Sequence, residues 1–305
     1  MSNMSDIKNE LQEKSNVNIK SKVFYNTKWD DKKFADLIIA TIKKVTKNAP
    51  SCPSNAKFFN NEKYWNTRRH ITYTVPVGKK PNDINNLQID SNEVFLERVI
   101  SYRKYLDDIN SIPPTFWNQF QVGKSPKEDV DIRIEENNKI KYVELKVLNK
   151  KRTADNPLFA IIESIKNYYL TKNEEDRKNI TELIVLAPDD YWEQLHNIEA
   201  VKSLKPLVNE LKKIIKTDIS LKKINFNSDD LREIDKIFRE YIMENKNNFQ
   251  KINIIEKTYT EERRQNKRAI PYDFVINNIK LEDVFSEKHL CKNNCINNLL
   301  KWTDL

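Results

Sequence analysis

At 305 residues, the chain is long enough for one large domain or two, and its 38% hydrophobic and 32% charged residues are typical of a folded globular protein. The formal charge of +8 favours a polyanionic partner, because clustered Lys and Arg gain by displacing counterions from a phosphate backbone. No run approaches the ~20 apolar residues of a membrane span, and the polar first twenty positions are unlike a signal peptide, so we expect a cytoplasmic protein with no membrane contact. The chain contains only two glycines, which excludes glycine-rich phosphate-binding loops. Its three cysteines are scattered, which argues against a disulfide framework.

The N-terminal third carries few signals of chemistry. Residues 1–22 are polar and predict a flexible tail or a weakly ordered helix, and apolar residues at helical spacing predict a helix over 29–47. A strand-like run at 71–75 follows Arg68 and Arg69, which are candidate phosphate contacts, although a plain solvated surface is the other interpretation. We therefore divide this part into the tail 1–22 and an N-terminal region 23–89.

The middle of the chain has the pattern of an α/β core. A helix is predicted over 91–110, where Asp90 and Glu93 have capping-box spacing, and Pro113-Pro114 follows it. Further elements are three strands at about 116–122, 128–135 and 140–148, a helix opened by Asn156-Pro157, a buried strand at 183–187, a helix at 192–216 and a strand at 222–226. This order predicts a mixed central sheet flanked by helices over 90–227. An amphipathic helix over 228–249 then opens a C-terminal helical region, 228–305.

The strongest local pattern is a predicted β-hairpin. Residues 128–147 alternate apolar and polar side chains around a turn at Asn137-Asn138, two residues of a type that tolerates positive φ. In this register Val130 faces Leu145 and Ile132 faces Val143 on one apolar side. Asp131 faces Glu144 on the other side, with Lys146 beside them.

Two facing carboxylates predict a divalent cation. Directly opposed side chains have Cβ atoms roughly 4.5–5.5 Å apart, and like charges at that distance are costly when buried. A shared Mg²⁺, for which Mn²⁺ can substitute, removes that cost and is suited to oxygen ligands. The alternative is an exposed sheet face with cross-strand ion pairs.

Asp131, followed after a short turn by Glu144-Leu145-Lys146, resembles the motif of the PD-(D/E)xK nuclease superfamily, which includes many restriction endonucleases. The resemblance covers about 91–187 and implies a restriction-endonuclease-like core. It implies that Asp131, Glu144 and the carbonyl of Leu145 hold the metal and that Lys146 positions water. The nearest upstream proline, Pro126, is five positions before Asp131, whereas in the family's name the proline is adjacent.

The resemblance also implies the remaining site residues and the activity. A further carboxylate often comes from the first helix, where Glu97 is preferred to Glu93, and Glu163 with Lys166 either points at the site or forms a solvent-facing pair. The expected function is that of a Mg²⁺-dependent endonuclease that cuts DNA, either as a type II restriction enzyme or in phage defence. If it cuts both strands, we expect it to act as a homodimer with two-fold symmetry. Alternatives are a repair or RNA-directed nuclease, a catalytically silent nucleic-acid-binding protein, or a protein-interaction module. Candidate nucleic-acid contacts are Arg68, Arg69, Lys150, Lys151 and Arg152.

Two smaller signals have ordinary interpretations. His289, Cys291 and Cys295 lack the paired spacing of a zinc site, so we expect no zinc there. Tyr191 and Trp192 are expected to pack inside the protein and not to stack on bases.

Overall fold

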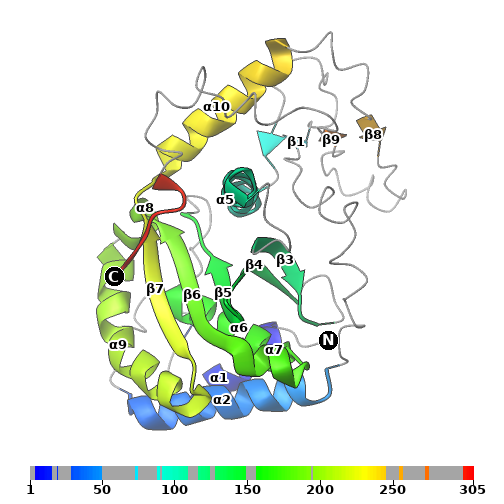
Figure 1. Cartoon of the computed structure of the whole chain (residues 1–305). Helices are drawn as coiled ribbons and strands as arrows, with labels where there is room; N and C mark the ends of the chain where they lie inside the picture. The colour runs from blue at the N-terminus through cyan, green and yellow to red at the C-terminus, as the bar shows by residue number, and fades with distance from the viewer. Residues whose placement is uncertain are drawn as a thin grey trace. The chain divides into compact units, whose positions relative to one another are not determined.

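The computed structural model describes residues 4–15, 19, 29–49, 73–74, 88–89, 91–108, 116–123, 128–148, 156–193, 195–244, 254–256, 272–274 and 298–305. The chain forms two compact units (Figure 1). Unit 1 comprises residues 1–57, 111–225 and 301–305, and unit 2 comprises residues 58–110 and 226–300. The domain boundaries inferred from sequence remain a prediction.

Unit 1 is built on a six-stranded mixed sheet with the strand order β10-β7-β6-β5-β4-β3. Strands β3 (Phe116–Gln121), β4 (Asp129–Glu136) and β5 (Lys139–Leu145) form an antiparallel meander. Strands β6 (Ile180–Pro188) and β7 (Asp218–Ile224) continue parallel to β5, and β10 (Trp302–Asp304) closes the edge antiparallel to β7. The predicted α/β class with a mixed sheet and flanking helices is therefore confirmed.

Helices connect and cover the parallel strands (Figure 1). α6 (Pro157–Leu170) links β5 to β6 and packs on both, and α9 (Leu195–Ile215) links β6 to β7. α2 (Asp31–Lys47) packs against both α6 and α9, and α1 (Met4–Ser15) packs against α2. Two short helices, α7 (Glu174–Asn179) and α8 (Asp189–Glu193), lie at the two ends of β6.

The hairpin forms as the alternation predicts. Asn137 and Asn138 have φ values of 52° and 62°, the left-handed conformation that a two-residue turn of this kind requires. Ile132 pairs with Val143, which confirms the predicted register. Both side chains are fully buried, so the apolar side of the hairpin belongs to the core.

The structure differs from the sequence expectations in several places, among them the strand expected at 222–226, which spans Asp218–Ile224. Residues 4–15 form a helix that buries Ile7 and Leu11, whereas we expected a loose tail or a weak helix. Helical structure begins at Asp189 and not at residue 192, and there the Trp192 indole N–H donates to the carbonyls of Ala187 (3.2 Å) and Lys222 (3.1 Å). The last residues add strand β10, in a region expected to be helical. Tyr191 and Trp192 are buried, as predicted.

Unit 2 contains two helices and two short β-ladders within its described residues. Helix α5 (Asn92–Asp108) matches the helix predicted at 91–110, and α10 (Ser228–Glu244) the one predicted at 228–249. Phe95 of α5 and Phe238 of α10 meet edge to face, with ring centroids 6.0 Å apart. β1 (Tyr73–Thr74) pairs with β2 (Gln88–Ile89), and β8 (Ile254–Glu256) pairs with β9 (Tyr272–Phe274). In the described part of the chain, no helix combines the length and apolarity that a membrane crossing needs.

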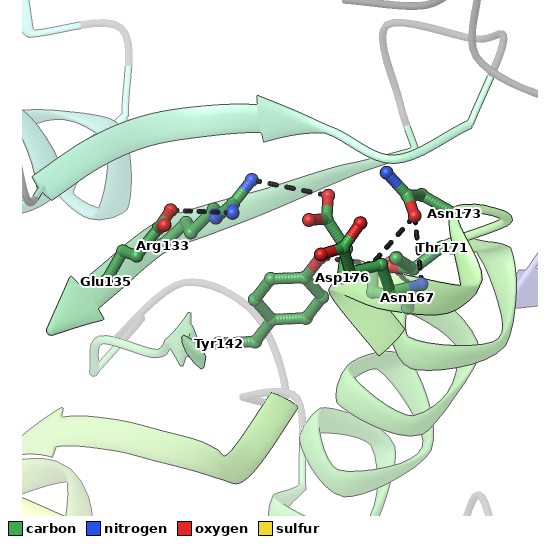
Figure 2. A network of polar contacts seen from close by, with 8 residues as sticks. Arg133, Glu135, Tyr142, Asn167, Thr171, Asn173 and Asp176 are labelled. Carbon is green, nitrogen blue, oxygen red and sulfur yellow. Dashed lines mark hydrogen bonds and ion pairs between the residues drawn. The ribbon is translucent and has the colours of Figure 1, made fainter. Parts of the chain in front are cut away.

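A polar network attaches the carboxyl end of α6 and the helix α7 to the sheet (Figure 2). The hydroxyls of Tyr142 on β5 and Thr171 at the end of α6 are 3.0 Å apart and hydrogen-bonded. Burial raises the pKa of Tyr142 to about 12, so its hydroxyl keeps its proton. The side-chain oxygen of Asn173 accepts from the backbone N–H groups of Glu175 (3.0 Å) and Asp176 (3.3 Å), which caps α7.

Arg133 of β4 is the charged centre of this network. Its guanidinium lies 2.8 Å from Glu135 and 3.8 Å from Asp176, and it sits over the rings of Trp117 (5.2 Å) and Phe120 (4.4 Å). The residue is only 7% exposed. Its aliphatic stem and its stacking therefore contribute to packing as well as to charge pairing.

We predict that Arg133→Ala lowers the free energy of unfolding by about 1–3 kcal/mol, because it removes buried packing and leaves the Asp176 carboxylate without its Arg133 partner. Glu135→Gln should cost less than about 1 kcal/mol, since Glu135 is more exposed and the pair is screened by water. Urea denaturation of both variants measures the difference; equal losses would show that stacking and burial of Arg133 add nothing.

Candidate active site

The predicted site residues come from three neighbouring elements of unit 1. Asp131 lies on β4, Glu144 and Lys146 lie at the end of β5, and Glu163 and Lys166 lie on α6. β5 stays paired with β6 as far as Leu145 and Leu186, and the Lys146 N–H donates to the Leu186 carbonyl at 2.9 Å. The backbone under Glu144 and Lys146 is therefore held by a central strand pair.

Asp131 stands where the pairing of β4 with β5 ends. The paired residues of the two strands run from Glu136 opposite Lys139 to Ile132 opposite Val143. Beyond it, a carboxylate oxygen of Asp131 accepts a 2.7 Å hydrogen bond from the backbone N–H of Leu145. The side chain thus takes the place of a backbone acceptor, and this bond fixes the Asp131 carboxylate beside Glu144.

A buried charge cluster surrounds these carboxylates. The Lys146 ammonium lies 2.7 Å from Glu144 and 3.7 Å from Glu163, and Glu163 is also 3.7 Å from Lys166. Glu144 and Lys146 are each 5% exposed, and Lys166 is 2% exposed. These values contradict an exposed sheet face with cross-strand ion pairs, and they show that Lys166 of the Glu163–Lys166 pair is buried. The Glu163 side chain, at 30% exposure, is the part of the cluster that reaches water.

Burial and mutual repulsion control the protonation of the cluster. Burial raises the pKa of Asp131 to about 6, in spite of the opposing charge of Lys146. Burial and the charges of Asp131 and Glu163 hold the pKa of Glu144 well above its usual value. Burial also acts to raise the pKa of Glu163, but the charges of Lys146, Lys166 and Lys8 and a hydrogen bond with Glu144 together lower it. The charged forms of Asp131 and Glu144 are therefore destabilised unless another cation joins them, whereas the charged form of Glu163 is favoured.

The residues fit a magnesium ion that keeps most of its water. Within the described ranges, no three Asp, Glu, His or Cys side chains gather as a metal-ion site. Mg²⁺ does not need such a cage, because it is commonly bound through one or two carboxylates plus waters and substrate phosphate. Asp131 and Glu144, whose charged forms are destabilised by burial, have the donor chemistry that this ion requires.

Other predicted residues are not brought to this cluster by what the structure describes. Glu97 is on α5 in unit 2 and is 2% exposed, and its assignment to the metal site, like that of Glu93, remains a prediction. The candidate nucleic-acid contacts Arg68, Arg69, Lys150, Lys151 and Arg152 lie outside the described residues, as do His289, Cys291 and Cys295.

Sequence reasoning missed the contribution of α1. We assigned no chemistry to residues 1–22, yet the charge of Lys8 acts on Glu163. An electrostatic interaction between residues so far apart in the chain leaves no periodic signal in either segment. Only the tertiary structure shows it.

Comparison with known proteins gives no relative of this chain. No family model matches it, and neither a curated protein nor a solved structure matches it. The interpretation of the site therefore rests on its own residues.

We predict that Mg²⁺ raises the melting temperature of the protein by several degrees, because an ion that binds only the folded state at about 100 times its Kd adds about 2.7 kcal/mol of stability. The double variant Asp131→Asn/Glu144→Gln should lose this shift. Glu182→Gln is the matched control, since Glu182 on β6 pairs with Lys222 at 2.9 Å and not with the cluster. An undiminished shift in the double variant would place the ion elsewhere.

Proposed function

We propose that the protein is a Mg²⁺-dependent nuclease of the PD-(D/E)xK type, with a restriction-endonuclease-like core and a site formed by Asp131, Glu144 and Lys146. The observation that carries the proposal is the 2.7 Å hydrogen bond from the Leu145 N–H to Asp131, which fixes one carboxylate beside the buried Glu144–Lys146 pair. Asp131, Glu144 and Lys146 are also the three residues of the motif predicted from the sequence. A structural ion pair alone does not explain why Asp131 and Glu163 place two more carboxylates beside the Glu144–Lys146 pair.

Each residue has a definite part in this proposal. Asp131, Glu144 and the carbonyl of Leu145 hold the ion, and a bound Mg²⁺ supplies positive charge that stabilises the charge developing on a phosphate. Lys146 donates hydrogen bonds that orient a water or a phosphate oxygen next to Glu144. Lys166 lies 3.7 Å from Glu163 and neutralises part of its charge. The Lys146 ammonium therefore does not have to neutralise both Glu144 and Glu163.

DNA is the substrate that the chemistry and charge favour. The formal charge of +8 suits a polyanion, and a cation beside a lysine suits a phosphodiester. We propose a cytoplasmic endonuclease of type II restriction or phage defence, assembled as a homodimer where both strands are cut. Arg68, Arg69, Lys150, Lys151 and Arg152 are the proposed contacts to the nucleic-acid backbone, and Mn²⁺ is the proposed substitute for Mg²⁺.

Incubation with supercoiled plasmid and Mg²⁺ tests this function. We expect nicking or linearisation by the wild type and a loss of roughly 10²–10⁴-fold in rate for Glu144→Ala and Lys146→Ala, because each removes a group that acts at the phosphate. Glu182→Ala, a carboxylate variant outside the cluster, should keep the wild-type rate.

Three results would count against this assignment. Unchanged cleavage by Glu144→Ala would remove Glu144 from the site. Salt-dependent binding of plasmid without cleavage in Mg²⁺ or Mn²⁺ would indicate a silent nucleic-acid-binding protein, and cleavage of RNA but not of DNA would indicate an RNA-directed nuclease.

A further inference from the structure

The carboxyl ends of helices α2 and α6 meet in unit 1 and carry a group of basic and tyrosine side chains. α2 packs against α6. The ammonium of Lys172, just after α6, donates at 3.0 Å to the carbonyl of Thr46 in the last turn of α2. One turn earlier in α2, the Lys43 ammonium lies 5.5 Å from the ring centroid of Tyr169 in α6. These contacts define one surface, here called the α2–α6 surface, with the side chains of Lys43, Lys47, Tyr168, Tyr169 and Lys172.

The three exposed lysines of this surface lack a carboxylate partner. Lys43 and Lys47 are four residues apart and therefore lie on one side of α2, and the bond to the end of α2 holds Lys172 close to Lys47. Among the residues that the structure describes, no carboxylate is within ion-pair distance of these lysines, and this includes the neighbouring Glu174 and Glu175. The negative ends of the two helix dipoles offset part of the repulsion between the three charges. An anion that contacts all three lysines would neutralise the rest.

Two tyrosine hydroxyls add hydrogen-bond donors to the same surface. Tyr168 and Tyr169 are half-buried, and their rings meet edge to face with centroids 5.2 Å apart. Neither hydroxyl bonds another group in the part of the chain that the structure describes. Burial raises the pKa of Tyr169 to about 12, so its hydroxyl keeps its proton and can donate to an anionic oxygen. The surface therefore combines ammonium donors with neutral hydroxyl donors.

We propose that the α2–α6 surface binds the phosphate backbone of DNA, with its three lysines as charged contacts and its two tyrosine hydroxyls as neutral donors. Backbone phosphates accept hydrogen bonds from both kinds of side chain, and each lysine that contacts a phosphate releases a condensed counterion. The choice of DNA as the polyanion rests on the proposed nuclease function. The ligand class is a duplex phosphodiester chain, bound without regard to base sequence.

The position of this surface on α6 separates it from the active site. Tyr168 and Tyr169 follow Glu163 by five and six residues, so at 3.6 residues per turn they lie on the side of α6 turned away from Glu163. Tyr169 is also about 9 Å further along the helix axis. A phosphate held here is therefore not the one that is cleaved. The positive charge of the surface is the same whether or not Mg²⁺ occupies the carboxylates of the active site.

The test is a fluorescence anisotropy titration of the full chain with a labelled DNA duplex, with Ca²⁺ in place of Mg²⁺, at several salt concentrations. We expect the triple variant Lys43→Gln/Lys47→Gln/Lys172→Gln to weaken binding by roughly 10–100-fold. The slope of log K against log salt should fall in magnitude by about two to three, because each lost phosphate contact is worth about 0.9. The double variant Tyr168→Phe/Tyr169→Phe should weaken binding by about 3–10-fold with an unchanged slope, since it removes hydrogen bonds but no charge.

The matched control removes the same amount of charge from elsewhere in unit 1. The triple variant Lys14→Gln/Lys33→Gln/Lys213→Gln changes three exposed lysines that each form an ion pair with a carboxylate of the chain. It should change the salt slope by less than about one. Replacement of all three lysines of the α2–α6 surface by arginine should restore the affinity and the slope.

The outcomes separate this inference from the proposed function. Equal losses of affinity and slope in the two lysine triple variants would show that net charge alone explains binding and would overturn the role of the α2–α6 surface. If the wild type binds and cleaves while the Lys43/Lys47/Lys172 variant keeps its affinity and slope, the surface is overturned and the nuclease assignment stands. If the wild type binds without cleaving, and this variant loses the slope, the surface stands and the nuclease assignment falls.

A folding defect must not decide the result. The double variant Lys43→Gln/Lys47→Gln keeps the Lys172 bond to Thr46, and it is measured alongside, with melting temperatures for every variant. It should lose about two-thirds of the slope change of the triple variant. A double variant with the wild-type melting temperature and the wild-type slope would overturn the proposal.

Discussion

The properties of the candidate site all follow from one constraint: carboxylates of like charge are buried together at the end of the β4–β5 hairpin. Asp131 and Glu144 are placed together by a strand register and by one hydrogen bond to the Leu145 N–H. Two carboxylates in such a position cost free energy unless cations surround them. Lys146 and Lys166 supply part of that compensation, and the raised pKa values of Asp131 and Glu144 show that the compensation is incomplete. This unbalanced charge is the physical reason to expect a metal ion.

Helix α6 is attached by hydrogen bonds to both strands of the hairpin that carries the candidate site. Near its middle, Glu163 faces the charge cluster at the end of β5. Further along, the Asn167 side chain donates to the Asp129 carbonyl at 3.0 Å, and Thr171 bonds the Tyr142 hydroxyl at 3.0 Å. Because α6 is held to both strands of the hairpin, Asp131, Glu144 and Glu163 of the candidate site stand on strands and a helix, and Lys146 directly follows β5, which favours precise placement.

Much of this local structure was predictable, because it depends on residues close in sequence. The alternation of apolar and polar residues predicted the two strands of the hairpin. Asn137 and Asn138 predicted the turn, and Asn156-Pro157 predicted the start of α6. The burial of Lys166, the docking of α1 and the addition of β10 depend on contacts between distant segments, which periodicity does not encode. The attachment of α8 to the sheet likewise depends on hydrogen bonds from the Trp192 indole N–H to the carbonyls of Ala187 and Lys222.

The central claim is that Asp131 and Glu144 bind one divalent cation between them. Anomalous diffraction from crystals of the protein soaked in Mn²⁺, recorded near the manganese absorption edge, tests it most directly. The account predicts a peak within coordination distance of a carboxylate oxygen of each residue, roughly 2.0–2.3 Å. A Mn²⁺ peak bound elsewhere in the molecule, with none between these two carboxylates at saturating Mn²⁺, would contradict it.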